Sequence, residues 1–163
     1  MIYILDTNII RTLLTSFPKK GKRYEEVWEK IDEKISDEEF ISVDECYNEL
    51  TKQFSDKTEQ YQWFRGRKDM FKNPDDKESV IISKLFVNSK MRETVHQKNI
   101  LENRPSADIY IVAKAKALNA TVVTKENYKP HSAQLPNLCE ELEVPCISYD
   151  DFMAIIDEFI EAV

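Results

Sequence analysis

Three observations predict an α/β fold built on a parallel sheet. The sequence opens with five apolar residues in a row, Met1–Leu5, and this run stops at Asp6. A short, unbroken apolar run is typical of a strand that is buried on both faces. Apolar residues then recur at helical spacing from Ile9 to Phe17, and strand patterns continue to alternate with helical ones along the chain. Asp6 is therefore expected at the C-terminal end of a strand, the edge at which open α/β sheets bind ligands.

The next elements repeat this alternation. The spacing of apolar residues over 24–36 predicts a helix with one apolar stripe. A second strand is predicted over 39–43, and Asp44 is expected to be the N-cap of the helix that follows. That helix carries Glu45 and Glu49 one turn apart near its start.

The stretch from about 55 to 100 has the least regular pattern. A break is expected at 73–75, which reads Asn-Pro-Asp, and the apolar residues between 80 and 91 predict one or two further helices. The stretch is short and no linker rich in proline or serine flanks it. We therefore expect a helical excursion over the sheet, inside a single domain that spans residues 1–163.

Regular patterns return after residue 104. Ser106 is expected to cap a helix that Asn119 ends, and a third strand is predicted over 120–124. A loop, a short helix, a fourth strand and a final helix are then predicted over 130–136, 138–142, 144–147 and 152–163.

Composition excludes several classes of protein. The chain has 163 residues, of which 42% are hydrophobic, and a net charge of −7 from 23 basic and 30 acidic residues. This balance argues against a broad basic surface for duplex DNA, although nucleic acid can still bind a local patch. Gly21 and Gly66 are the only glycines, which excludes glycine-rich phosphate loops and dinucleotide fingerprints.

The same features predict a cytoplasmic protein with no membrane segment. No apolar run approaches the roughly 20 residues of a membrane helix. Met1 begins the first strand itself, so no signal peptide is expected. The three cysteines, Cys46, Cys139 and Cys146, are an odd number that suits a reducing compartment better than a disulfide framework.

Four acidic residues follow or flank the predicted strands: Asp6, Glu49, Asp108 and Glu126. In a parallel sheet, three of them come from one edge, and Asp108 joins them if the loop before its helix bends over that edge. Converging carboxylates repel one another unless cations neutralise them. Oxygen ligands without histidine or cysteine favour Mg²⁺ or Mn²⁺ over zinc. Such a site can activate water and stabilise an in-line phosphoryl displacement.

The order of these motifs resembles that of the PIN-domain ribonucleases over nearly the whole chain. The resemblance rests on Asp6-Thr7-Asn8 after a hydrophobic strand, Glu49-Leu50 in mid-chain, Pro105–Asp108 at the start of an Ala-rich helix, and Thr121–Glu126. A little-characterised prokaryotic, toxin-like (VapC-like) branch is particularly similar. Its shared features here are the middle segment with Trp63 and the Cys-Glu-Glu-Leu run of 139–142.

The resemblance implies a three-layer α/β/α sandwich around a central, mostly parallel sheet of four or five strands. It implies an endoribonuclease that cleaves single-stranded RNA with Mg²⁺ or Mn²⁺, and that forms a toxin–antitoxin pair with a small antitoxin protein. It leaves a homodimer open.

The same resemblance assigns roles to individual residues. Asp6, Glu49 and Asp108 would be catalytic carboxylates that bind metal, and Glu126 stands where many members have aspartate. The supporting polar residues would be Thr7, Asn8 and Thr124. From their position near these motifs, Arg11, Lys125 and Lys129 are candidates for contacts with RNA phosphates.

Each assignment has a simpler alternative. Asp6 can be the cap of the helix it precedes, and Asp108 a residue that interacts with a helix dipole. Glu49 can be a solvated helix residue, with Glu45 in its role, and Glu126 a turn residue. A further cluster, Arg65, Arg67 and Lys68 beside Trp63 and Phe64, is either a surface for single-stranded RNA or a solvated helix end.

Three other functions stay open on the sequence alone. The first is an RNA-processing PIN nuclease without an antitoxin. The second is a phosphohydrolase with Asp6 as nucleophile, although such enzymes usually carry a second aspartate where this chain has Asn8. The third is an inactive PIN domain that binds RNA or protein, against which the four intact acids argue.

Overall fold

The computed structural model describes residues 1–87, 107–130, 132 and 134–162. Its centre is a five-stranded sheet in the order β3-β2-β1-β4-β5, in which every described pair of neighbouring strands is parallel. The strands are β1 (Tyr3–Leu5), β2 (Phe40–Val43), β3 (Phe71–Lys72), β4 (Thr121–Val123) and β5 (Cys146–Ile147). Residues of β1, β2 and β4 are buried throughout, as expected for parallel strands covered on both faces.

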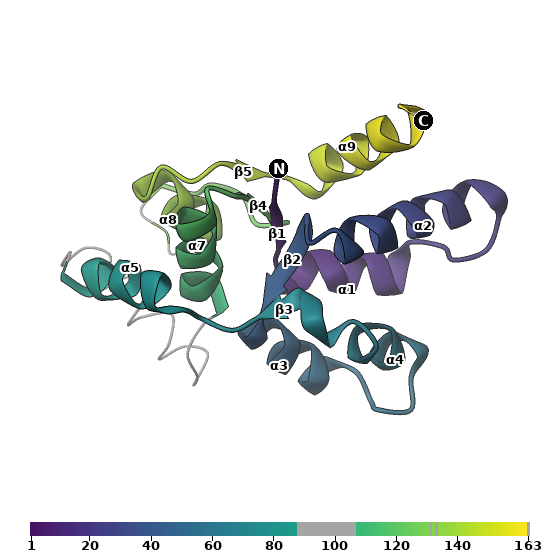
Figure 1. The fold of residues 1–163 in the computed structure, drawn as a ribbon, viewed down its shortest axis with the longest axis horizontal. Helices are drawn as coiled ribbons and strands as arrows, with labels where there is room; N and C mark the ends of the chain where they lie inside the picture. The colour runs from purple at the N-terminus through teal and green to yellow at the C-terminus, as the bar shows by residue number, and fades with distance from the viewer. Residues whose placement is uncertain (88–106, 131, 133, 163) are drawn as a thin grey trace.

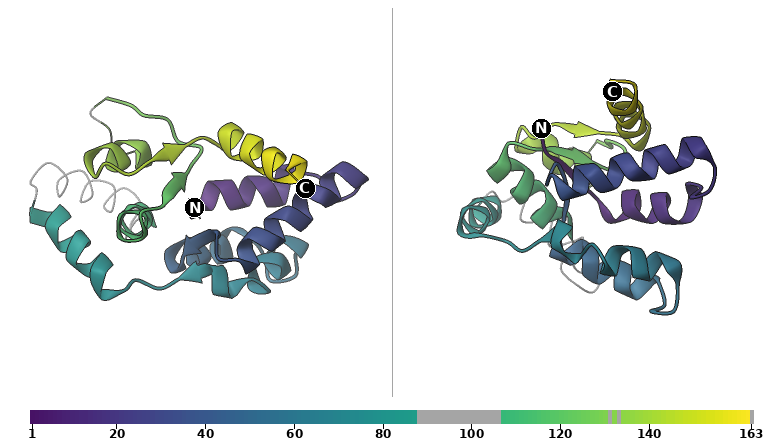
Figure 2. Two further views of the ribbon diagram at one scale, coloured as in Figure 1. Left: turned by 45° about the horizontal axis from the view of Figure 1, so that its top comes forward. Right: turned by 45° about the vertical axis from the view of Figure 1, so that its right-hand side comes forward.

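Helices cover the sheet on both sides (Figures 1 and 2), which confirms the predicted three-layer α/β/α fold. On one side lie α1 (Thr7–Ser16), α2 (Lys22–Ser36) and α9 (Tyr149–Glu161). On the other lie α5 (Asp76–Val87), α7 (Ala107–Leu118) and α8 (Leu135–Glu141). Between β2 and β3 the chain forms α3 (Asp44–Gln53), α4 (Glu59–Arg65) and a 3₁₀ turn, η1 (Lys68–Met70).

The strand order creates a reversal beside β1. The chain moves from β1 to β2 and β3 in one direction, then returns across the sheet to β4 and β5 on the other flank of β1. The crevice beyond the carboxyl ends of β1 and β4 is therefore the switch point, where open α/β sheets bind their ligands.

The helix α7 has apolar residues on all sides and is the most buried of the described helices. Ile111, Val112 and Ala115 are almost completely inaccessible to solvent. The reason is that α7 packs against β1, β2 and β4 on one side while α5 and α8 cover it on another. A helix without a polar face requires cover of this kind.

The predicted helix ends agree with the structure at some positions and not at others. Asn119 has a φ of 54° and ends α7, where the amide of Ala120 donates to the carbonyl of Ala115 at 2.9 Å. The prediction that Asp44 is an N-cap is wrong. Because β2 runs directly into α3, Val43 precedes the helix and Asp44 is its first residue. The predicted cap Ser106 lies outside the described residues.

The stretch between β2 and α7 holds a strand that the sequence analysis did not predict. Strand β3 pairs with β2 through Ser42↔Phe71 and Val43↔Lys72, and it supplies one edge of the sheet. The predicted break at 73–75 does separate β3 from α5. Residues 88–100 of the predicted excursion lie outside the described residues. None of the described helices is both long enough and apolar enough to span a lipid bilayer.

Candidate active site

Asp6 lies where β1 ends and α1 begins, at the switch point. Its amide donates to the carbonyl of Val123 at 3.1 Å, which continues the pairing of β1 with β4. Its Oδ1 accepts a hydrogen bond from the Thr7 amide at 2.7 Å, and its Oδ2 accepts one from the Thr124 hydroxyl at 2.9 Å. The residue is only 4% exposed. The side chain therefore caps the helix and is also fixed from the neighbouring strand.

The charge on Asp6 is unfavourable in this position. Burial, the nearby charge of Glu126 and, more weakly, that of Glu49 together raise the pKa of its carboxyl to about 7. The hydrogen bonds from Thr124 and Thr7 oppose this increase. A carboxylate that is buried among other acids in this way is stabilised by a cation.

Glu49 and Glu45 point to different surroundings although they lie one turn apart on α3. Oε2 of Glu49 accepts a hydrogen bond of 2.6 Å from the hydroxyl of Thr7, the residue next to Asp6. The pKa of Glu45 is raised, chiefly by burial, with Asp44 and Glu78 adding to the effect and Lys114 opposing it. Of the two, Glu49 is the one that is hydrogen-bonded beside Asp6.

Glu126 links the end of β4 to the start of α8. Its amide donates to the Thr124 hydroxyl at 3.1 Å, and its Oε2 accepts a hydrogen bond of 2.7 Å from the amide of Leu135. The side chain thus holds the loop before α8, the structural role of a turn residue. Its charge nevertheless acts on Asp6, so the two interpretations of Glu126 are compatible.

Asp108 lies in the first turn of α7 and is only 6% exposed. This helix packs on the strands that carry Asp6 and Glu126 at their ends. Its position in the first turn is favourable for a negative charge because of the helix dipole.

The acids have the donor chemistry for a hard cation but do not form a complete cage. Carboxylate oxygens suit Mg²⁺ and Mn²⁺. The raised pKa of Asp6 reflects its burial and the like charges nearby, and a bound ion would offset both effects. Among the described residues, no three histidine, cysteine, aspartate or glutamate side chains lie close enough together to hold one ion. The four-carboxylate ligand set therefore stays a prediction.

The other predicted site residues differ in how directly they contact the acids. Thr7 and Thr124 hydrogen-bond to the acids directly. Asn8 is half-buried in the first turn of α1. Lys125 is exposed and donates to the Thr12 hydroxyl on α1 at 3.2 Å, which puts its ammonium group beside the helix that Asp6 caps.

The remaining basic candidates are on the surface. Arg11 is exposed on α1. Lys129 is exposed as well, and its backbone exchanges hydrogen bonds with the Asn137 side chain at 3.2 and 2.7 Å.

The sequence does not reveal that the charges of these acids act on the three thiols. Burial raises the pKa of Cys46 to about 12, and the charge of Asp6 contributes to this effect. Cys139 contacts Cys146, and the charges of Asp6 and Glu126 act on both thiols. These residues come from α3, α8 and β5. Their spacing in the sequence does not indicate that they lie near the same carboxylates.

Comparisons with known proteins agree with this fold. Residues 3–158 match the family described as Domain of unknown function (DUF4411), and no similar sequence was found among curated proteins. The chain resembles the structure of VapBC-1 from nontypeable Haemophilus influenzae with a TM-score of 0.52 and 18% identity, over 92% of this chain and 99% of that one. VapBC2 from Rickettsia felis, solved with a DNA fragment from its promoter, gives 0.49 and 16% over 91% and 98%.

The predicted resemblance to a VapC-like PIN protein is thus confirmed at the level of the fold, since the likeness to VapBC-1 extends over almost the entire length of both chains. The family match covers all five strands and all but the last turn of α9. We conclude that the chain belongs to the DUF4411 family and that its domain has a PIN-like fold.

Proposed function

We propose that this protein is an endoribonuclease that cleaves single-stranded RNA with the help of Mg²⁺ or Mn²⁺. The observation that carries the proposal is the state of Asp6. Its carboxyl is buried at the switch point of the sheet, next to Glu126 and Glu49, and its pKa is raised to about 7 by burial and by these charges. A site of this kind would suit a divalent cation and an anionic substrate.

In this proposal Asp6, Glu49, Asp108 and Glu126 hold the metal. When bound, the metal supplies an activated water and stabilises the charge that develops on the phosphate. Thr7 fixes Glu49 and Thr124 fixes Asp6 through the hydrogen bonds of 2.6 and 2.9 Å. Lys125, on the same edge, offers a positive charge to the RNA backbone, and Arg11 and Lys129 are further candidates.

Residue 8 favours this function over a phosphohydrolase with Asp6 as nucleophile. Such enzymes usually carry a second aspartate two residues after the first, and this chain has Asn8 there, half-buried in the first turn of α1. An amide side chain cannot act as the general acid or base that a second aspartate provides.

The test of this proposal is a cleavage assay on single-stranded RNA. Purified protein should cleave the RNA when Mn²⁺ or Mg²⁺ is present and stop when EDTA is added. Cleavage should return when excess Mn²⁺ is restored. Cleavage by clean protein that persists in EDTA would refute the mechanism, and absence of cleavage with either ion would favour an inactive PIN domain.

We further propose that the protein acts in the cytoplasm as the toxin of a toxin–antitoxin pair, with a small co-encoded protein as its antitoxin. The likeness to VapBC-1 supports this role. Such a partner can restrain the nuclease by inserting a basic side chain among the four acids, because a guanidinium pairs with carboxylates and replaces the charge of the metal.

Growth of cells that express the chain alone tests the toxin role. The wild-type protein should slow growth, and the Asp6→Asn form should not. If both forms are tolerated equally and no neighbouring gene product binds, the toxin role is refuted. An RNA-processing nuclease without an antitoxin would then be the better interpretation.

A further inference from the structure

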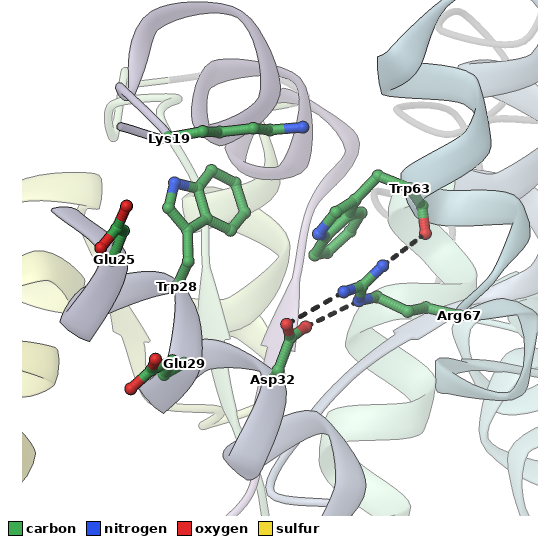
Figure 3. A pocket seen from close by; sticks show the side chains of 7 residues that line it. All are labelled: Lys19, Glu25, Trp28, Glu29, Asp32, Trp63 and Arg67. Carbon is green, nitrogen blue, oxygen red and sulfur yellow. Dashed lines mark hydrogen bonds and ion pairs between the residues drawn. The ribbon is translucent and has the colours of Figure 1, made fainter. Parts of the chain in front are cut away.

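A second candidate site lies between α2 and the end of α4, away from the acids at the switch point. A cavity of about 300 Å³ opens there, and Figure 3 shows the side chains that surround it. Its volume is at the lower end of the range for ligand pockets, roughly 300–1,000 Å³. A cavity of this size suits one large side chain or one small molecule.

The walls of the cavity are two tryptophans. Trp28 of α2 and Trp63 of α4 pack edge to face, with ring centroids 5.8 Å apart and an angle of 68° between the rings. The indole nitrogen of Trp28 donates to the carbonyl of Pro18 at 2.9 Å, which fixes that ring. The chain has no other tryptophan, so its indole fluorescence comes from this cavity alone.

Cations already occupy part of each indole surface. The guanidinium of Arg67 lies 4.3 Å from the centre of the Trp63 ring, and the ammonium of Lys19 lies 5.5 Å from the centre of the Trp28 ring. Both distances are within the range of cation–π attraction. The cavity therefore has the chemistry to stack a cation.

The charges around the rim favour a cation over an anion. Arg67 forms two hydrogen bonds with Asp32, at 2.7 and 2.9 Å, and these two charges offset each other. Glu25 and Glu29 on the outer side of α2 also line the cavity and are exposed. Within the described part of the chain neither forms a salt bridge. Only Lys19 opposes them, and the remaining rim charge is negative.

This arrangement changes the interpretation of the basic cluster in the sequence. Arg67 is committed to Asp32 and to the carbonyl of Trp63, and Phe64 is completely buried. Neither side chain is therefore free to contact single-stranded RNA, as the RNA-surface interpretation of this cluster requires. The carboxylates of Glu25 and Glu29 would also repel its phosphates.

We propose that this cavity receives an arginine side chain from a basic, extended segment of a protein partner. A planar guanidinium can stack on an indole and pair with a carboxylate at the same time, which a compact ammonium does less well. Glu25 and Glu29 lie one turn apart along α2, so a segment with more than one positive charge gains more than a single ion. The inference deepens the partner role in the proposed function, and it uses none of the nuclease chemistry.

Tryptophan fluorescence of the full chain gives a direct test. The probe is a synthetic peptide with three arginines separated by pairs of alanines, and its control carries citrulline in place of arginine. The arginine peptide should change the fluorescence in a saturable manner, and the citrulline peptide should not. Glu29→Gln should weaken binding by about twofold to fivefold. Lys19→Gln should tighten it, because this change removes the competing cation.

Glu26→Gln is the matched control, since it removes the same charge from the same helix at a residue that does not line the cavity. Equal weakening by Glu26→Gln and Glu29→Gln would overturn the proposal in favour of unspecific attraction. So would equal binding of the citrulline peptide, or tetramethylammonium binding as tightly as the peptide. A single-stranded RNA that quenches the fluorescence and binds more tightly to Glu29→Gln would overturn it as well. Binding of the peptide to Asp6→Asn should be unchanged, which separates this test from that of the nuclease.

Discussion

Asp6 shows how one side chain can satisfy a local rule and create an electrostatic cost. As a cap it accepts the Thr7 amide, a role that any aspartate before a helix can fill. The same position buries the carboxyl beside Glu126, and its pKa rises to about 7. The helix cap and the candidate metal ligand are therefore two properties of the same residue.

We expect Asp6→Asn to stabilise the metal-free protein at pH 8 but not at pH 4. The native carboxyl keeps its proton up to about pH 7, whereas the unfolded chain loses it near 3.8. Between these values the native state binds the extra proton, so stability falls as pH rises. The full difference between the native and unfolded pKa values corresponds to at most about 4 kcal/mol in the free energy of unfolding. Each kcal/mol raises the melting temperature by roughly 2–4 °C in a chain of this size.

Thermal unfolding in EDTA at the two pH values measures this effect. Asp56→Asn is the control, because Asp56 is exposed and lies outside the helices. A variant that is destabilised at pH 8, or stabilised equally at pH 4 and pH 8, would show that Asp6 is not strained by its charge.

Glu49 and Glu45 give a second test at the residue scale. Glu49→Gln should lower RNA cleavage by about tenfold or more, the range found for residues around a metal site. Glu45→Gln should leave cleavage close to the wild-type value, since the Thr7 hydroxyl bonds to Glu49. The measurement is the initial rate with Mn²⁺ for both variants. A larger loss of cleavage for Glu45→Gln would place the metal site one helical turn nearer the start of α3.

At the scale of elements, a buried ion pair joins α5 to α7. The ammonium of Lys114 lies 2.5 Å from Oε1 of Glu78 and donates to the carbonyl of Asn73 at 2.7 Å. The side chains are only 6% and 1% exposed. Removing one partner from a buried pair leaves the other charge without compensation, while replacing both by apolar groups often costs little.

Lys114→Met should therefore destabilise the protein by about 3–5 kcal/mol. The double variant Lys114→Met with Glu78→Leu should recover most of this loss. Urea unfolding of both variants and of Glu78→Leu completes the cycle. A loss in the double variant equal to the sum of the two single losses would mean that the charges are not coupled.

Sequence periodicity predicts the elements that repeat a pattern and misses those that do not. The helices α1, α2 and α9 have clear apolar stripes and appear where predicted, within a few residues. Strand β3 has only two residues, which is too short for any alternation to be seen. The pairing of Lys114 with Glu78 joins residues whose distance in sequence conceals their contact.

At the scale of the molecule, the parallel sheet makes part of the candidate site predictable. Since β1 and β4 are parallel neighbours, any polar residues that follow them must lie at the same edge, as Asp6 and Thr124 do. The side-chain contacts cannot be predicted in this way. Nothing in the sequence indicates that Oε2 of Glu126 turns to the amide of Leu135, because that bond depends on where the loop before α8 folds back.

The most direct test of the central claim is a titration of the purified protein with Mn²⁺ at pH 8, followed by the electron paramagnetic resonance signal of the free ion. The wild-type protein should bind Mn²⁺, and Asp6→Asn should weaken binding by about tenfold or more, because it removes a charged oxygen ligand. Asp56→Asn should bind like the wild type. No uptake of Mn²⁺ by the wild-type protein, or equal uptake by Asp6→Asn, would contradict the proposal that the acids around Asp6 form a metal-dependent nuclease site.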